Sequence, residues 1–323
     1  MRVAFIADEI TTFIKDHDST WALMQAAFEL GDEVFYAHAA HLKILHNHPA
    51  ADLMRLDEEF FRHQNTSKAK LLELPRAMNL LTMNLDEFDL VFMRKDPPVD
   101  MNYLNACQIL GLCRKALVVN NPHSIIKFNE KLSTLNFPEL TPLTLVSRSL
   151  QEIQEFLDKH KKIVIKPIDQ MGGRGVFSIE LGDQNTDGLI DTATNQSANL
   201  VIVQEYLPEI KIHGDKRIIM ICGKPVGAIL RIPPAGDFRA NLAAGGSCVK
   251  YDLTETDLEL CSKLEAFLVE NEIYLAGIDV IGTKLTEINI TSPTCLQEIN
   301  RSQGLVGKGK LEFVMMEKLK NLP

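Results

Sequence analysis

Short apolar runs alternate with amphipathic stretches over the first third of this chain, in the strand, helix, strand order that begins a βαβ unit. Between residues 38 and 85 the periodicity is poor and polar residues dominate, which favours loops and short helices. We therefore expect an open α/β sheet domain over residues 1–122, with strands at 2–7, 33–37, 88–93 and 116–119 and helices at 19–30 and 102–113.

Predicted strands become more frequent after residue 122. Helices are expected at 127–136, 150–160 and 254–271 and from about residue 295 onward, and strands at 144–146, 162–166, 176–181, 200–204, 216–222, 226–232, 276–281 and 285–290. Small residues with almost no core character fill the stretch 233–246. A loop of this kind between strands is typical of a mobile lid.

The predicted hairpin of strands 276–281 and 285–290 carries the most informative polar residues. Its short turn places Asp279 opposite Glu287, and two carboxylates roughly 5 Å apart across a ladder repel unless a cation joins them. Asn289 follows Glu287 by two residues and therefore lies on the same face. Three oxygen donors indicate a site for Mg²⁺ held together with substrate phosphates. An ordinary surface hairpin with solvated charges is the alternative.

A glycine-rich turn, residues 167–175, lies between two predicted strands. It does not open a helix, which distinguishes it from a dinucleotide-binding fingerprint and from a P-loop. Gly172 and Gly173 are suited to laying backbone N–H groups over a polyphosphate. Lys166 ends the strand before the turn, and either it or Lys131 can place an ammonium group on a phosphate oxygen. A plain hairpin turn beside solvated lysines is the alternative.

Arginines on the strands and in the predicted lid add positive charge. Arg217, within Asp215-Lys216-Arg217, and Arg231 lie on neighbouring strands, and Arg239 lies in the lid. Guanidinium groups match carboxylate and phosphate edges, although strand-edge arginines also serve solubility. Arg94 ends a strand of the first domain, where ligands of open α/β sheets bind, and a plain Pro-Pro stop to that strand is the alternative. Together with the acidic hairpin, these residues describe a pocket where ATP-Mg and an anionic acceptor meet.

Composition limits the other functions open to the chain. Its 323 residues have a net charge of −9, which argues against nucleic-acid binding. No apolar run approaches the roughly 18 residues of a membrane span, and an early acidic residue, Asp8, argues against a signal peptide. Six scattered cysteines without a C-x-x-C pair are typical of a reduced compartment and disfavour a zinc site. We expect a soluble, cytoplasmic protein.

Eight segments in order resemble the prokaryotic-type glutathione synthetases of the ATP-grasp superfamily, nearly end to end. They are MRKDPP at 93–98, NEKL at 129–132, KPIDQMGG at 166–173, QEYLP at 204–208, GDKR at 214–217, RIP at 231–233, RANLAAGG at 239–246 and TEINITSPT at 286–294. Gln170 stands where the family has glycine, and His213 where an acid is common. These departures put loop dynamics and nucleotide affinity in doubt more than the reaction.

The resemblance implies an ATP-grasp fold, in which a central lobe at 123–203 and a C-terminal lobe at 204–323 follow the N-terminal domain along the chain. It implies ligation of γ-glutamylcysteine and glycine through an acyl phosphate, with ATP and Mg²⁺ (or Mn²⁺ in its place). We also expect a homo-oligomer without nucleic-acid or membrane partners. A D-alanine–D-alanine or peptide glutamate ligase, and a non-catalytic nucleotide-binding module, are the alternatives.

The resemblance also implies a role for each candidate residue. Metal ligation is expected of Asp279, Glu287 and Asn289; nucleotide binding of Lys131, Lys166, Gly172, Gly173, Glu205, Tyr206, Leu207 and Asp215; charge neutralisation during catalysis of Arg217, Arg231 and Arg239; and substrate binding of Arg94, Asn241, Gly245, Gly246, Ser292 and Thr294.

Overall fold

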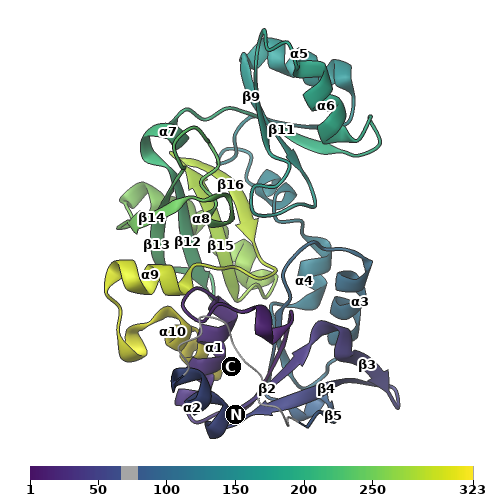
Figure 1. Ribbon diagram of the computed structural model, residues 1–323, viewed down its shortest axis with the longest axis vertical. Coiled ribbons are helices and arrows are strands. Elements are labelled where there is room, and N and C mark those ends of the chain that lie inside the picture. The colour runs from purple at the N-terminus through teal and green to yellow at the C-terminus, as the bar shows by residue number, and fades with distance from the viewer. Residues whose placement is uncertain (67–78, 323) are drawn as a thin grey trace.

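The computed structural model of the protein describes residues 1–66 and 79–322, which form three β-sheets stacked along the long axis of the molecule (Figure 1). The N-terminal sheet lies at the bottom of this view, a five-stranded sheet in the middle and a four-stranded sheet at the top. Among the described residues, no helix is both long enough and apolar enough to cross a membrane.

The N-terminal sheet has the predicted parallel centre. Strands β2 (Glu33–His38), β1 (Arg2–Ala7), β6 (Leu90–Arg94) and β7 (Leu117–Val119) lie side by side in that order, all parallel. The connecting helices are α1 (Ser19–Glu29), α3 (Met101–Leu110) and α4 (Pro122–Lys127). An open α/β domain at the N-terminus is therefore confirmed.

The expectation of loops and short helices over residues 38–85 was wrong. Strand β4 (His48–Leu56) pairs antiparallel with β2, and β3 (Leu42–Leu45) and β5 (Leu81–Asn84) pair with β4; helix α2 (Glu58–Thr66) follows. The alternation that marks a half-exposed strand is absent because successive residues of β4, including Ala50, Ala51, Leu53 and Met54, are buried. Residues 67–78 of this segment lie outside the described residues.

The four-stranded sheet is antiparallel, with strands β10 (Phe177–Glu180), β9 (Lys162–Pro167), β11 (Val201–Glu205) and β8 (Thr144–Ser147) in that order. Helices α5 (Leu150–His160) and α6 (Thr186–Thr194) contribute Ile153, Leu157 and Ile190 to the core of this sheet. The expected lobe boundary at residue 203 falls within β11, whose last two residues continue the sheet.

The five-stranded sheet is also antiparallel, in the order β14 (Ser247–Lys250), β13 (Lys224–Ile232), β12 (Asp215–Ile221), β15 (Leu275–Ile281) and β16 (Lys284–Asn289); the short helix α7 (Glu209–His213) precedes β12. Alternate residues of β12 point to two different cores. Ile218 packs with α8 (Glu255–Glu270), whereas Ile219 packs with α9 (Leu296–Gln303) and α10 (Leu311–Lys320). The second core also contains α1, so it joins this sheet to the N-terminal domain.

Candidate active site

Two adjoining pockets lie at the five-stranded sheet. The first is a cleft lined from both the four-stranded and five-stranded sheets, by residues such as Lys166 of β9 and Asp215 of β12. The second reaches Asp96 and Pro97 of the N-terminal domain. Met171, Gly172, Asn241 and Glu287 line both. Clefts lined by several elements in this way suit small-molecule ligands.

The first pocket brings together every residue that the sequence assigned to the nucleotide. Its lining includes Lys131, Lys166, Gly172, Gly173, Glu205, Tyr206, Leu207 and Asp215. The side chain of Glu205 accepts a hydrogen bond from the backbone N–H of Leu143 at 3.0 Å, and the ring of Tyr206 lies 4.7 Å from the ammonium of Lys162. Leu143 directly precedes β8 and Lys162 begins β9, so both contacts come from the four-stranded sheet or its edge.

Asp279 on β15 lies opposite Glu287 on β16 as expected, although the turn is one residue shorter than predicted and a bulge between Asp279 and Val280 restores this pairing. Asp279 is buried, and Arg217 donates to its carboxylate from Nε at 2.6 Å and from Nη2 at 3.1 Å. Arg231 Nη2 lies 2.9 Å from the same carboxylate. Burial opposes ionisation, but the two guanidinium groups outweigh it and hold the pKa of Asp279 well below its ordinary value.

Asp215 and Arg231 form a second buried ion pair across β12 and β13. Burial raises the pKa of Asp215, although Arg231 acts in the opposite direction. Within the described residues, Oδ1 of Asp215 has no hydrogen-bond partner. Arg217 and Arg231 therefore organise the acidic residues of β12 and β15, and both also line the second pocket.

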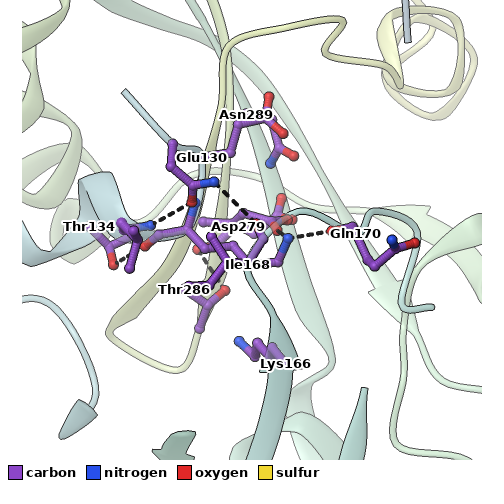
Figure 2. A network of polar contacts seen from close by, with 12 residues as sticks. Glu130, Thr134, Lys166, Ile168, Gln170, Asp279, Thr286 and Asn289 are labelled. Atoms are coloured by element: carbon purple, nitrogen blue, oxygen red, sulfur yellow. Dashed lines mark hydrogen bonds and ion pairs between the residues drawn. The ribbon is translucent and has the colours of Figure 1, made fainter. Parts of the chain in front are cut away.

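The two lysines reach the first pocket from different elements. Lys166 Nζ donates to Oε1 of Gln204 at 2.8 Å, and burial lowers the pKa of Lys166. Lys131 Nζ lies 3.3 Å from Oε1 of Glu287 and also donates to the carbonyl of Gln170 in the glycine turn (Figure 2). These ammonium groups flank the space between the turn and the hairpin.

The predicted helix over 127–136 was wrong at its centre. Helix α4 ends at Lys127, and a 3₁₀ turn, η4 (Leu132–Asn136), begins after Lys131. Asn129 causes the interruption, because its Oδ1 accepts the backbone N–H groups of Lys131 and Leu132, each at 3.0 Å. The break brings Lys131 to the wall of the pocket.

The glycine turn and the predicted lid are in contact. Gly173 has a φ of +77°, and a Cβ there would lie 3.0 Å from Oδ1 of Asn241. Arg239 Nη1 donates to the carbonyl of Gly173 at 3.3 Å. Arg239 Nη2 donates to Oδ2 of Asp237 at 2.7 Å. Hydrogen bonding from the Arg239 side chain lowers the pKa of Asp237 to about 2. A side chain at position 173 would separate the two loops.

The residues assigned to substrate are divided between different surroundings. Ser292 and Thr294 line the second pocket, and Asn241 lines both pockets. Neither lining includes Gly245 or Gly246. A Cβ at Gly246 would lie 2.2 Å from the carbonyl oxygen of Ala240, so this glycine is required by the turn of the lid.

Arg94 does not lie on a pocket surface as expected. It is 4% exposed and donates to Oγ1 of Thr20 at 3.1 Å and to the carbonyl of Pro293 at 3.0 Å. Through Pro293, which lines the second pocket, the buried Arg94 side chain stabilises the wall of that pocket. The sequence pattern placed it correctly at a strand end, but could not show which neighbours the guanidinium would find.

Three residues of the site were missed by the sequence interpretation. Gln204 holds Lys166, Asp237 holds Arg239, and Glu130 accepts hydrogen bonds from Ile290 and Thr291. Burial and the nearby charge of Glu287 raise the pKa of Glu130. The position of Glu130 between Asn129 and Lys131 was a usable signal, since both neighbours lie in a segment already singled out.

The hairpin residues fit one hard cation. Among the described residues, no group of three or more His, Cys, Asp or Glu side chains is arranged to hold a metal, and the set proposed from sequence contains only two. Asn289 donates from Nδ2 to the carbonyl of Gly277 at 2.9 Å, so Oδ1 is the atom of its side chain that could contact a cation. A carboxylate accepts about four contacts, and Asp279 receives three from the arginines. The Asp279 carboxylate could therefore accept one further contact, such as one from a metal ion.

Comparisons with known proteins agree in both domains. Residues 1–125 match the prokaryotic glutathione synthetase N-terminal domain, and residues 130–304 match the prokaryotic glutathione synthetase ATP-grasp domain. The chain is 41% identical to the glutathione synthetase of Gloeobacter violaceus, over 95% of this chain and 94% of that one. It is 40% identical to that of Synechocystis, over 94% and 96%.

Solved structures share the fold at low sequence identity. D-cycloserine synthetase superposes with a TM-score of 0.67 at 14% identity, covering 99% of this chain and 100% of that one. Macrocyclase MdnC, bound with precursor peptide MdnA from Microcystis aeruginosa, gives a TM-score of 0.65 at 14% identity and covers 100% of both chains. The ATP-grasp ligase PsnB complexed with minimal precursor gives a TM-score of 0.60 at 12% identity, covering 98% and 99%. The ATP-grasp fold expected from the sequence is confirmed.

Proposed function

The chain belongs to the prokaryotic glutathione synthetase family, and we propose that it ligates γ-glutamylcysteine and glycine, converting ATP to ADP and phosphate. The observation that carries this proposal is the meeting of two pockets at Glu287. One is lined by lysines and a glycine turn suited to a triphosphate, and the other by arginines and small polar residues suited to a carboxylate substrate.

The first pocket is proposed to hold ATP. Lys131 and Lys166 would contact the phosphates, Gly172 and Gly173 would cover them, and the segment Glu205 to Leu207 would hold adenine beside Asp215. Asp279, Glu287 and Asn289 would hold Mg²⁺, or Mn²⁺ in its place, and the bound ion would neutralise phosphate charge. The division into lobes at 1–122, 123–203 and 204–323, and a homo-oligomeric state, stay predictions.

The second pocket is proposed to hold the dipeptide and glycine. The cysteinyl carboxylate takes the γ-phosphoryl group of ATP and becomes an acyl phosphate, with ADP leaving. The glycine amine then attacks that carbonyl carbon, loses a proton, and phosphate leaves. Arg217 and Arg231 line this pocket and would offset the negative charge that develops, and Ser292 and Thr294 would provide small polar contacts.

The test is phosphate release by the whole protein with ATP and Mg²⁺, omitting γ-glutamylcysteine and glycine in turn. We expect full turnover only when both are present. Turnover with D-alanine alone, or with glutamate and a peptide acceptor, would indicate one of the other ATP-grasp ligases. Nucleotide binding without turnover on any acceptor would identify a non-catalytic module.

The lid, residues 233–246, is predicted to keep water from the acyl phosphate, since Arg239 and Asn241 bring it against the glycine turn. Replacing residues 234–238 with a shorter glycine linker should release more phosphate than glutathione, by roughly severalfold, because water then competes with glycine. Measuring both products in one reaction checks this. A shortened protein that keeps equal yields at the normal rate would show that the loop is not a lid.

A further inference from the structure

Residues 129–131 form the short connection between α4 and η4, and their three side chains contact different parts of the site. Asn129 Nδ2 donates to the carbonyl of Ile168 at 3.1 Å, just before the glycine turn. Lys131 contacts Gln170 and Glu287, at the first pocket. Glu130 instead contacts the segment that follows β16, at the second pocket.

One carboxylate oxygen of Glu130 collects three hydrogen bonds. Oε1 accepts from the backbone N–H groups of Ile290 at 2.7 Å and Thr291 at 2.9 Å, and from the Thr291 hydroxyl at 2.8 Å. The carbonyl of Glu130 also accepts the N–H of Ile288 at 2.8 Å. Ile290 and Thr291 are both buried, so their N–H groups depend on this carboxylate oxygen as an acceptor. This contact fixes the backbone immediately after Asn289.

The fixed segment leads directly into the wall of the second pocket, which Thr291, Ser292, Pro293 and Thr294 line. Without the carboxylate, two buried N–H groups would lose their acceptor, and the segment would have to move to find another. Lys166 is held by Gln204, and the glycine turn is contacted by Asn129 and Lys131, through hydrogen bonds that do not use the Glu130 carboxylate. Loss of the Glu130 carboxylate should therefore change the second pocket more than the first.

We propose that Glu130 is a positioning residue that shapes residues 290–294 to receive γ-glutamylcysteine, and so sets the affinity for the dipeptide rather than for the nucleotide. The inference rests on the proposed function, because it takes the second pocket as the dipeptide site. Glu130 acts through the backbone that it holds, and its distinguishing property is the acceptor oxygen.

The test is steady-state kinetics of the whole protein with Glu130→Ala, Glu130→Gln and Thr291→Val. Removing the acceptor in Glu130→Ala should raise the KM for γ-glutamylcysteine by about tenfold or more, while the KM for ATP stays within about twofold. Glutamine keeps a side-chain oxygen at the same place, so Glu130→Gln should return the dipeptide KM to within about threefold of the wild type. Thr291→Val loses one of the three donors and should show a smaller shift in the same direction.

Three outcomes would overturn the inference: equal shifts in both KM values, a Glu130→Gln variant as impaired as Glu130→Ala, or unchanged kinetics throughout. Glu130→Gln impaired like alanine would assign the role to charge. If Glu130→Ala does not fold, Thr291→Val tests the inference instead. Its KM for γ-glutamylcysteine should rise more than its KM for ATP, and equal changes would overturn the inference. The wild type reports separately on the proposed function, since a wild-type protein that makes no glutathione refutes that function whatever the variants do.

Discussion

Glu287→Gln is expected to lower turnover by at least about a hundredfold at saturating substrates, because it removes one of two carboxylates proposed to hold Mg²⁺ where phosphoryl charge develops. Glutamine keeps the shape of the side chain, and Glu287 is partly exposed, so the fold should be retained. The structure adds a second consequence, since Glu287 also faces Lys131. The measurement is glutathione formation across a range of Mg²⁺ concentrations, with thermal unfolding recorded alongside.

Glu180→Gln is the matched control for this variant. Glu180 also lies on a strand and pairs with a lysine, Lys162 at 2.9 Å, but at an exposed position of the four-stranded sheet. Exposed pairs of this kind contribute little, so its turnover should match the wild type. If Glu287→Gln proves equally active once Mg²⁺ saturates, Glu287 is not a metal ligand and the assignment of the hairpin fails.

The hairpin could be predicted from sequence because its evidence is local. A short turn joins the two neighbouring strands and sets their pairing at Val280 and Ile281. A β-bulge then shifts the register between Asp279 and Val280, and this shift brings Asp279 opposite Glu287. The sequence pattern predicted the same pairing from a turn one residue longer and did not show the bulge. The glycine turn between β9 and β10 was predictable from local turn chemistry.

Contacts between distant elements were beyond this kind of argument. The pattern could place Arg217 and Arg231 on adjacent strands, but not show that both would hold Asp279, which lies more than forty positions along the chain from either. Arg94 was placed correctly at a strand end, yet its partner Pro293 comes from the other end of the chain. Strand β4 was missed because burial on both faces removes the alternation that identifies a strand.

The structure gives Gly246 a role in the turn of the lid that the sequence interpretation did not include. Sequence reasoning placed it at the glycine-binding end of the site, where a side chain would exclude the substrate. In the structure its backbone N–H donates to the carbonyl of Asn241 at 3.2 Å, and an added Cβ would meet the carbonyl of Ala240. A larger residue at 246 must therefore deform the lid itself, because a backbone carbonyl cannot move aside as a flexible side chain can.

Gly246→Ala is thus expected to lower glutathione formation by about a hundredfold, the loss that follows when groups near the chemistry move by about 1 Å. Arg239 and Asn241 lie on the same lid and line the first pocket, so ATP affinity should fall together with glycine use. The control is Gly236→Ala, where nothing lies within 4 Å of the added Cβ and a φ of +86° costs only about 1–2 kcal/mol of strain. Nucleotide affinity and glycine-dependent turnover are measured on both variants. A Gly246→Ala protein that binds ATP normally and fails only with glycine would restore the original interpretation, in which this residue packs against the amino acid.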